Sequence, residues 1–128
     1  MFIFFSSDVF ARNLIKLANI GSPVAAGNVF QGTTNILHKF QLSVTDANVT
    51  LTKISCYVGG NCSSADITCL KVWYSADAYF DNTDITLSTL TNFGNAGLKT
   101  FSVTPTLTVK LNVPVYIFIT ADIAANAT

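Results

Sequence analysis

The sequence contains no glutamate and few charged residues. All seven acidic residues are aspartates, seven lysines and arginines balance them, and charged residues make up only 11% of the 128 residues. Soluble domains usually carry about 25% charged residues. With zero net charge the chain has no electrostatic footprint for DNA, RNA or anionic lipid, so nucleic-acid binding is not expected. The lack of glutamate, a strong helix former, and the recurrence of Thr, Val, Ile and Phe predict an all-β fold.

The chain also lacks a long hydrophobic run at its start. The opening apolar run covers only Met1–Phe5, and no positive charge precedes it. It is too short to cross a membrane and has none of the usual features of a signal peptide. We therefore expect no membrane span, and a mature protein or a fragment whose export signal is missing or has been removed.

Hydrophobic residues, by contrast, are abundant and make up 50% of the chain. Either apolar surface is buried between subunits, or the polar surface consists of uncharged Ser, Thr and Asn. Trp73, Tyr57, Tyr79 and the phenylalanine-rich start favour the first explanation, because large apolar patches usually mark interaction sites. We expect copies of this chain to contact one another.

Cysteine and histidine are too few and too scattered for a zinc site. Cys56, Cys62 and Cys69 have no Cys-x-x-Cys spacing, and the single histidine, His38, is remote from them. No cofactor is expected. One disulfide and one free thiol would fit an extracellular location. Strand parity makes Cys62–Cys69 the first choice and Cys56–Cys69 the second, and three half-buried thiols are the alternative.

Alternating hydrophobicity predicts most of the strands. Residues 13–20 favour a first strand over a capped helix across 9–19, and residues 21–35 form a loop. In the strand over 36–44, Ile36 and His38 are expected to share a face with Phe40, Leu42 and Val44. Further strands are predicted over 49–58, 67–75, 85–93, 98–104, 105–112 and 114–123.

These short strands, separated by turns, predict an immunoglobulin-like two-sheet β-sandwich of about seven strands. Residues 1–27 form an N-terminal extension or first strand and a donor segment for a neighbour, and residues 28–128 form the sandwich domain. A phase change between Leu51 and Ile54 indicates a bulge. The strand over 114–123 is apolar on both faces and is expected at the centre of a sheet.

The side chain of Trp73 has two interpretations. If Leu70, Val72 and Tyr74 face the core, then Trp73 and Lys71 point outward. An outward tryptophan is either a contact residue or a ring lying flat over its own sheet. We include Trp73 in the predicted assembly interface because aromatic side chains carry much of the energy of interfaces.

No set of residues indicates catalysis, so we expect a non-enzyme. The sequence contains no nucleophile elbow, phosphate-binding glycine loop or metalloprotease motif. The best metal candidate is calcium at Asp77, Asp81 and Asp84, which share one loop. Aspartates in such loops more often hydrogen-bond their own turns. His38 is interpreted as a structural residue.

Four stretches, NILHKFQLSV, VTLTKISCYVGG, ADITCLKVWYSAD with Phe80, and VYIFITADIAANA, resemble a β-sandwich module of secreted Bacteroidota surface proteins. That module is similar to the N-terminal domain associated with BNR-repeat neuraminidases. The resemblance implies an accessory or surface-displayed module in an extracellular or cell-surface location. Family members usually continue into a further strand that this sequence lacks, and they do not usually have these cysteines.

A sandwich without its final strand exposes an edge that another chain can fill. The segment Phe2, Ile3, Phe4 and Phe5, or residues 13–20, could add to a neighbour by donor-strand complementation. The leading functional hypothesis is therefore a structural subunit of an extracellular filament or surface assembly built from copies of itself. The alternative is an accessory or carbohydrate-binding domain of a secreted glycosidase or adhesin, with a glycan as partner.

Overall fold

The residues that the computed structural model describes, 3–7, 15–22, 24 and 27–127, form strands, turns and loops without any helix. The all-β prediction is confirmed. None of the described residues belongs to a helix that is long and apolar enough to span a membrane. The strands are β1 (Ile3–Ser7), β2 (Ile15–Asn19), β3 (Thr34–Val44), β4 (Val49–Ser63), β5 (Ile67–Ser75), β6 (Ile85–Leu90), β7 (Asn95–Val109) and β8 (Val115–Ile123).

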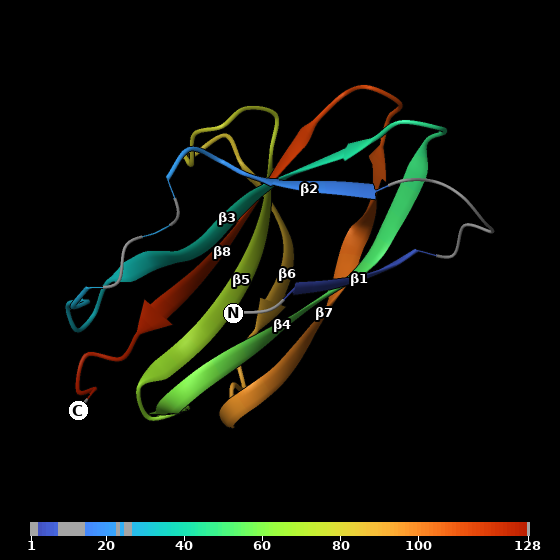
Figure 1. The fold of residues 1–128 in the computed structure, drawn as a ribbon. Coiled ribbons are helices and arrows are strands. Elements are labelled where there is room, and N and C mark those ends of the chain that lie inside the picture. The colour runs from blue at the N-terminus through green and yellow to red at the C-terminus, as the bar shows by residue number, and fades with distance from the viewer. Residues whose placement is uncertain (1–2, 8–14, 23, 25–26, 128) are drawn as a thin grey trace.

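The strands form two antiparallel sheets that pack face to face, which confirms the predicted sandwich. One sheet has the order β1-β4-β7 and the other the order β2-β3-β8-β5-β6 (Figure 1). The N-terminal segment contributes to both, because β1 lies at an edge of the three-stranded sheet and β2 at an edge of the five-stranded sheet. Residues 15–19 therefore form a strand, as the sequence favoured, and not a helix. Residues 8–14 lie outside the described part.

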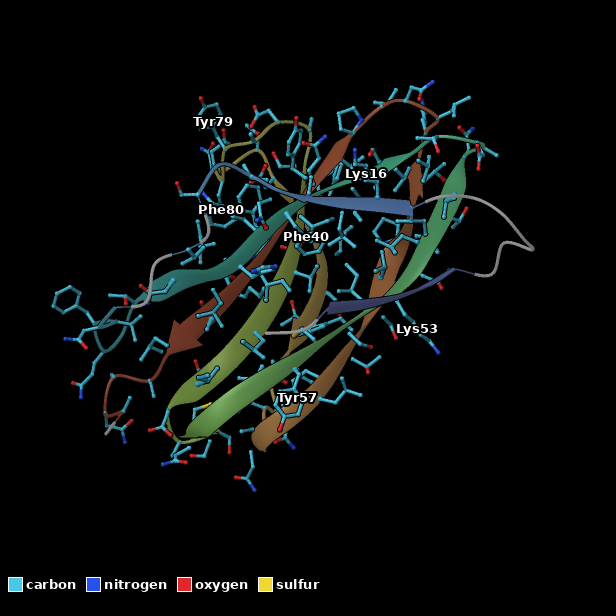
Figure 2. All side chains as sticks on the ribbon, viewed as in Figure 1. Lys16, Phe40, Lys53, Tyr57, Tyr79 and Phe80 are labelled. Carbon is cyan, nitrogen blue, oxygen red and sulfur yellow. The ribbon has the colours of Figure 1, made fainter. Side chains whose placement is uncertain are left out.

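The hydrophobic core lies between the inner faces of the two sheets. Phe40, labelled in Figure 2, lies between the layers, and almost none of its surface is exposed. The largest fully buried side chains of this core include Phe93, Phe101, Leu42, Leu51, Ile54, Leu70, Ile117 and Ile119. Sheets that alternate between apolar and polar residues pack in this way, because burial of apolar area provides the main driving force for folding.

β8 lies at the centre of the five-stranded sheet, between β3 and β5, as its apolar sequence predicts. Val115, Ile117 and Ile119 face the core. Phe118 and Thr120 point to the outer face, yet they are also buried. A strand covered on both sides carries apolar residues on both faces, and this explains why the pattern of β8 does not alternate.

In three strands a bulge changes which side chains point to the core. The predicted irregularity in β4 is confirmed by a register shift between Leu51 and Lys53. In β3 a shift between Ile36 and His38 places Ile36 opposite Thr120, on the outer face. The expected common face of Ile36 and His38 is therefore wrong, because an extra residue in one strand inverts the alternation.

A similar shift between Ile67 and Cys69 breaks the alternation of β5. Ile67 and Leu70 both belong to the core cluster, although the sequence pattern put them on opposite faces. Two boundaries also differ from expectation. The strand predicted over 49–58 continues to Ser63, so the loop expected before residue 67 is shorter. The strands predicted over 98–104 and 105–112 are one strand, β7, which begins at Asn95.

Candidate functional site

The loop between β5 and β6 holds the three aspartates considered for calcium, and they cap its turns instead. Asp77 accepts a hydrogen bond from the Tyr79 backbone, at 2.9 Å, and Asp81 accepts two from Thr83. Asp84 accepts one from the Asp81 backbone at 3.0 Å. The hydrogen bonds from Thr83 hold the pKa of Asp81 below its usual value. Within the described residues no group of three acidic, cysteine or histidine side chains could hold a metal ion.

The same loop folds back over the outer face of the five-stranded sheet and partly covers Trp73. The ring of Phe80 lies edge-on to Trp73 with centroids 5.3 Å apart, and 5.4 Å from the ring of Phe118. Nε1 of Trp73 donates a hydrogen bond to Oγ1 of Thr120 at 2.9 Å. Trp73 is therefore half-buried against its own sheet, and Tyr79 is the exposed aromatic of this loop (Figure 2).

Beside this cluster one ion pair crosses the outer face. Nζ of Lys71 donates to Oδ2 of Asp122 at 2.8 Å, and Oγ1 of Thr34 donates to Oδ1 of the same carboxylate at 2.6 Å. Burial alone would raise the pKa of Asp122, but these hydrogen bonds outweigh it and lower the pKa. The hydrogen bond to Asp122 raises the pKa of Lys71. This pair joins β5, β8 and β3 on the outer face of the sheet.

The three cysteines are free thiols, and neither predicted disulfide is formed. Cys56 is part of the core between the sheets, and Cys62, at the end of β4, packs against the core on the same side. Cys69 points to the outer face of β5, near Lys71 and Asp122. The five-stranded sheet lies between Cys69 and the other two thiols. The sequence pattern placed Cys62 in a loop from which it could reach either side, whereas β4 extends far enough to include it.

His38 lies on the inner side of β3, where its ring contacts Phe40 with centroids 5.5 Å apart. Burial lowers the pKa of His38, because the low-dielectric surroundings disfavour the charged imidazolium. This environment fits the predicted structural role.

The four edge strands differ in their protection against pairing with another chain. β2 contains Lys16, and β7 contains Pro105. Lysine and proline at an edge are usual devices that prevent edge-to-edge association. β6 and β1 contain no charged residue. The sheet edges at β6 and β1 are therefore the least protected.

β1 is the predicted donor segment, and the structure pairs Ile3–Ser7 with β4 of the same chain. Ile3 pairs with Cys56, Phe4 with Ser55 and Phe5 with Ile54. Phe2 and the side chains of residues 3–7 lie outside what the structure describes. Since Ile54 and Cys56 are fully buried core residues, β1 covers the edge of the sheet directly beside the core.

An apolar surface also remains on the outer face of the three-stranded sheet. Tyr57 of β4 and Leu98 of β7 are direct cross-strand partners, and they are 49% and 58% exposed. Next to them Ser55 and Thr100 share a hydrogen bond between their hydroxyl groups at 3.0 Å. Among the described side chains on this face of β4, that of Lys53 is charged (Figure 2). This face is thus largely uncharged.

No protein-family model, curated protein or solved structure matches this chain. The fold and its surfaces therefore carry the functional interpretation.

Proposed function

We propose that this chain is a non-catalytic structural subunit of an extracellular filament or surface assembly, and that its copies associate by strand addition and apolar contacts. The observation that supports this proposal most strongly is the position of β1. It is a five-residue, uncharged strand at the edge of a sheet, and it pairs with the part of β4 that carries Ile54 and Cys56.

The same pairing can be made between two chains. A β1 strand from a neighbour that takes the register Ile3 with Cys56 satisfies the same backbone groups of β4. Strand exchange therefore needs no new interface, and the seven residues between Ser7 and Ile15 connect the donor to its own sandwich. Because donor and acceptor differ, the contact runs head to tail and closes into a ring or continues as a filament.

The exposed pair Tyr57 and Leu98 adds a second kind of contact. Both residues lie on a largely uncharged sheet face beside the β1 edge, so a neighbour held by β1 can bury them. Burial of aromatic and aliphatic side chains without charge desolvation favours association.

Deletion of residues 1–12 tests the proposal. We expect the shortened chain to form no large multimers in size-exclusion chromatography and no particles in electron microscopy. A synthetic peptide of residues 1–12 should bind to it. The same peptide with both Phe4→Pro and Phe5→Pro should not, because adjacent amides point to opposite edges of a strand and one of the two would have to donate to β4. Assembly that survives the deletion unchanged would overturn the proposal.

The alternative function, an accessory or carbohydrate-binding domain of a secreted glycosidase or adhesin, is supported by Tyr79. Its ring is 77% exposed on the loop that packs on Trp73. Exposed aromatic rings form apolar contacts with ligands and leave a polar tip in water. The matching experiment is glycan-array binding by the monomer, with Tyr79→Ala as the variant that should lose it. The resemblance to Bacteroidota surface modules is compatible with both functions and stays a prediction.

A further inference from the structure

The turn that precedes β3 is fixed to the C-terminal end of the sandwich. The amide of Gly32, at a φ of 70°, donates to the carbonyl oxygens of Ile123 and Ala124 at 3.1 and 3.3 Å, and the amide of Ile123 donates to the Thr33 carbonyl at 2.9 Å. The side-chain amide of Gln31 donates to the Ala127 carbonyl. Figure 1 shows this turn and the chain end on the same side of the molecule.

Phe30 projects from this anchored turn. Its side chain is 79% exposed, the largest exposure among the large hydrophobic residues of the described part. Oγ1 of Thr33 donates to the Phe30 carbonyl at 2.6 Å, which fixes the backbone that carries the ring. A single exposed phenylalanine on a loop needs no explanation, but here the anchored backbone fixes the point from which the ring projects into water.

A cavity of about 520 Å³ opens beside Phe30. Its two nearest chain neighbours, Val29 and Gln31, form part of the wall. Leu37, Ile67 and Ile123 supply the apolar lining, and Asn61, Cys62, Asp66 and Ala127 complete it. The size and lining are those of a site that takes a compact apolar group.

We propose that Phe30 of one chain inserts into this cavity of a second copy, and that the second copy inserts its Phe30 in return. In a two-fold, isologous interface each subunit presents the same surface to the other. Such an interface requires that the protruding side chain and the cavity that receives it lie on one surface patch. Phe30 and the cavity lie side by side, because Val29 and Gln31 form part of the cavity wall, so one rotation axis can bring the two pairs together. The contact involves neither β1 nor β4 pairing, and it is therefore independent of the strand exchange proposed above.

The chemistry of the occupant supports a second copy over a free small molecule. The cavity is mostly apolar and has no unpaired charge at its wall, since Asp66 accepts hydrogen bonds from the amide and the hydroxyl of Ser63, at 2.9 and 3.1 Å. An aromatic ring needs no polar partner there. A buried aromatic anchor in a pocket is the usual centre of a protein interface.

Cys62 provides a chemical probe of the cavity. It lines the wall and is partly exposed, whereas Cys56 and Cys69 are buried. Alkylation of the native protein with iodoacetamide, followed by peptide mass spectrometry, should modify Cys62 in dilute solution. The rate should fall as protein concentration rises, because the partner's ring then covers the thiol.

The Phe30→Ala variant should remove that protection and weaken dimerisation by at least about 30-fold in sedimentation equilibrium. Tyr79→Ala is the matched control, because Tyr79 is a comparably exposed aromatic, and it should leave both measurements unchanged. Prior alkylation of Cys62 should also weaken dimerisation, because the added polar group occupies part of the apolar cavity.

Two results would overturn this inference. One is a Cys62 rate that does not depend on concentration, which would show that the cavity stays open or is covered within the chain. The other is an unchanged dimer in Phe30→Ala. Because neither measurement involves residues 1–12, a chain lacking them distinguishes the two proposals: it should lose strand exchange and keep the Phe30 dimer.

Discussion

Nε1 of Trp73 and Oγ1 of Thr120 form a hydrogen bond of 2.9 Å that joins β5 to β8 across the outer face of the five-stranded sheet. Thr120 is fully buried, so removal of the Trp73 indole leaves the threonine hydroxyl without this hydrogen bond in a place that water does not reach. This hydrogen bond gives the buried threonine hydroxyl of the central strand a partner.

The first prediction concerns this pair. Thr120→Val and Trp73→Phe should each lower the free energy of unfolding by about 1–3 kcal/mol. The double variant should lose less than the sum, with a coupling of about 0.5–1.5 kcal/mol, because the hydrogen bond can be lost only once. Urea denaturation of the four proteins measures the cycle. Strict additivity would show that the bond contributes nothing.

The second prediction concerns the cover over Trp73. Phe80→Ala removes the ring contacts at 5.3 Å to Trp73 and 5.4 Å to Phe118 and should destabilise the fold by about 1–3 kcal/mol. Trp73 is the only tryptophan, so its emission should shift to the red and become easier to quench with acrylamide. Tyr79→Ala, the neighbouring exposed position, should change neither property. An unchanged emission spectrum in Phe80→Ala would contradict the packing.

The third prediction concerns acid stability. The pKa of Asp122 is lower in the folded chain than in the unfolded chain, so its ionised form stabilises the fold at neutral pH. That contribution, about 1 kcal/mol for a partly exposed pair, should be lost as the pH falls below about 4 and through the folded pKa. Asp122→Asn should therefore be less stable than the wild type at pH 7 and equally stable at the acid end. A stability difference that stays constant with pH would contradict this assignment.

The fourth prediction concerns the thiols. Burial raises the pKa of Cys56 to about 11 and also raises the pKa of Cys69, so both should react slowly in the native protein. Ellman's reagent should titrate Cys62 first and all three cysteines after unfolding in denaturant without reductant. A single thiol after unfolding would show that a disulfide forms after all.

The sequence pattern predicted the sandwich because its main features are local. The alternation of β3 from His38 to Val44 and the apolar run of β8 need no knowledge of the partner strands. The bulge in β4 was also visible, because two apolar residues, Leu51 and Ile54, are out of phase. These signals follow directly from the two-residue period of a strand.

The errors arise where a distant part of the chain decides the outcome. The bulges at Ile36 and Ile67 have no local signature, and only pairing with β8 reveals them. The outward direction of Trp73 was predicted correctly, but its cover comes from Phe80, in a loop whose return path no periodicity encodes. The cavity beside Phe30 is likewise invisible in the sequence, because three separate segments form its wall.

Strand exchange by β1 can be tested directly by a cross-link between Phe4 and Ser55, which pair across β1 and β4. Paired Cα atoms lie about 4.5–5.5 Å apart, within the span of a disulfide. The double variant Phe4→Cys and Ser55→Cys, in a Cys62→Ser background, is assembled under reducing conditions and then oxidised. Non-reducing electrophoresis should show a ladder of covalent multimers, and the Ser55→Cys single variant should not. Assembled particles that yield only monomers, or the absence of particles at every concentration, would contradict the account.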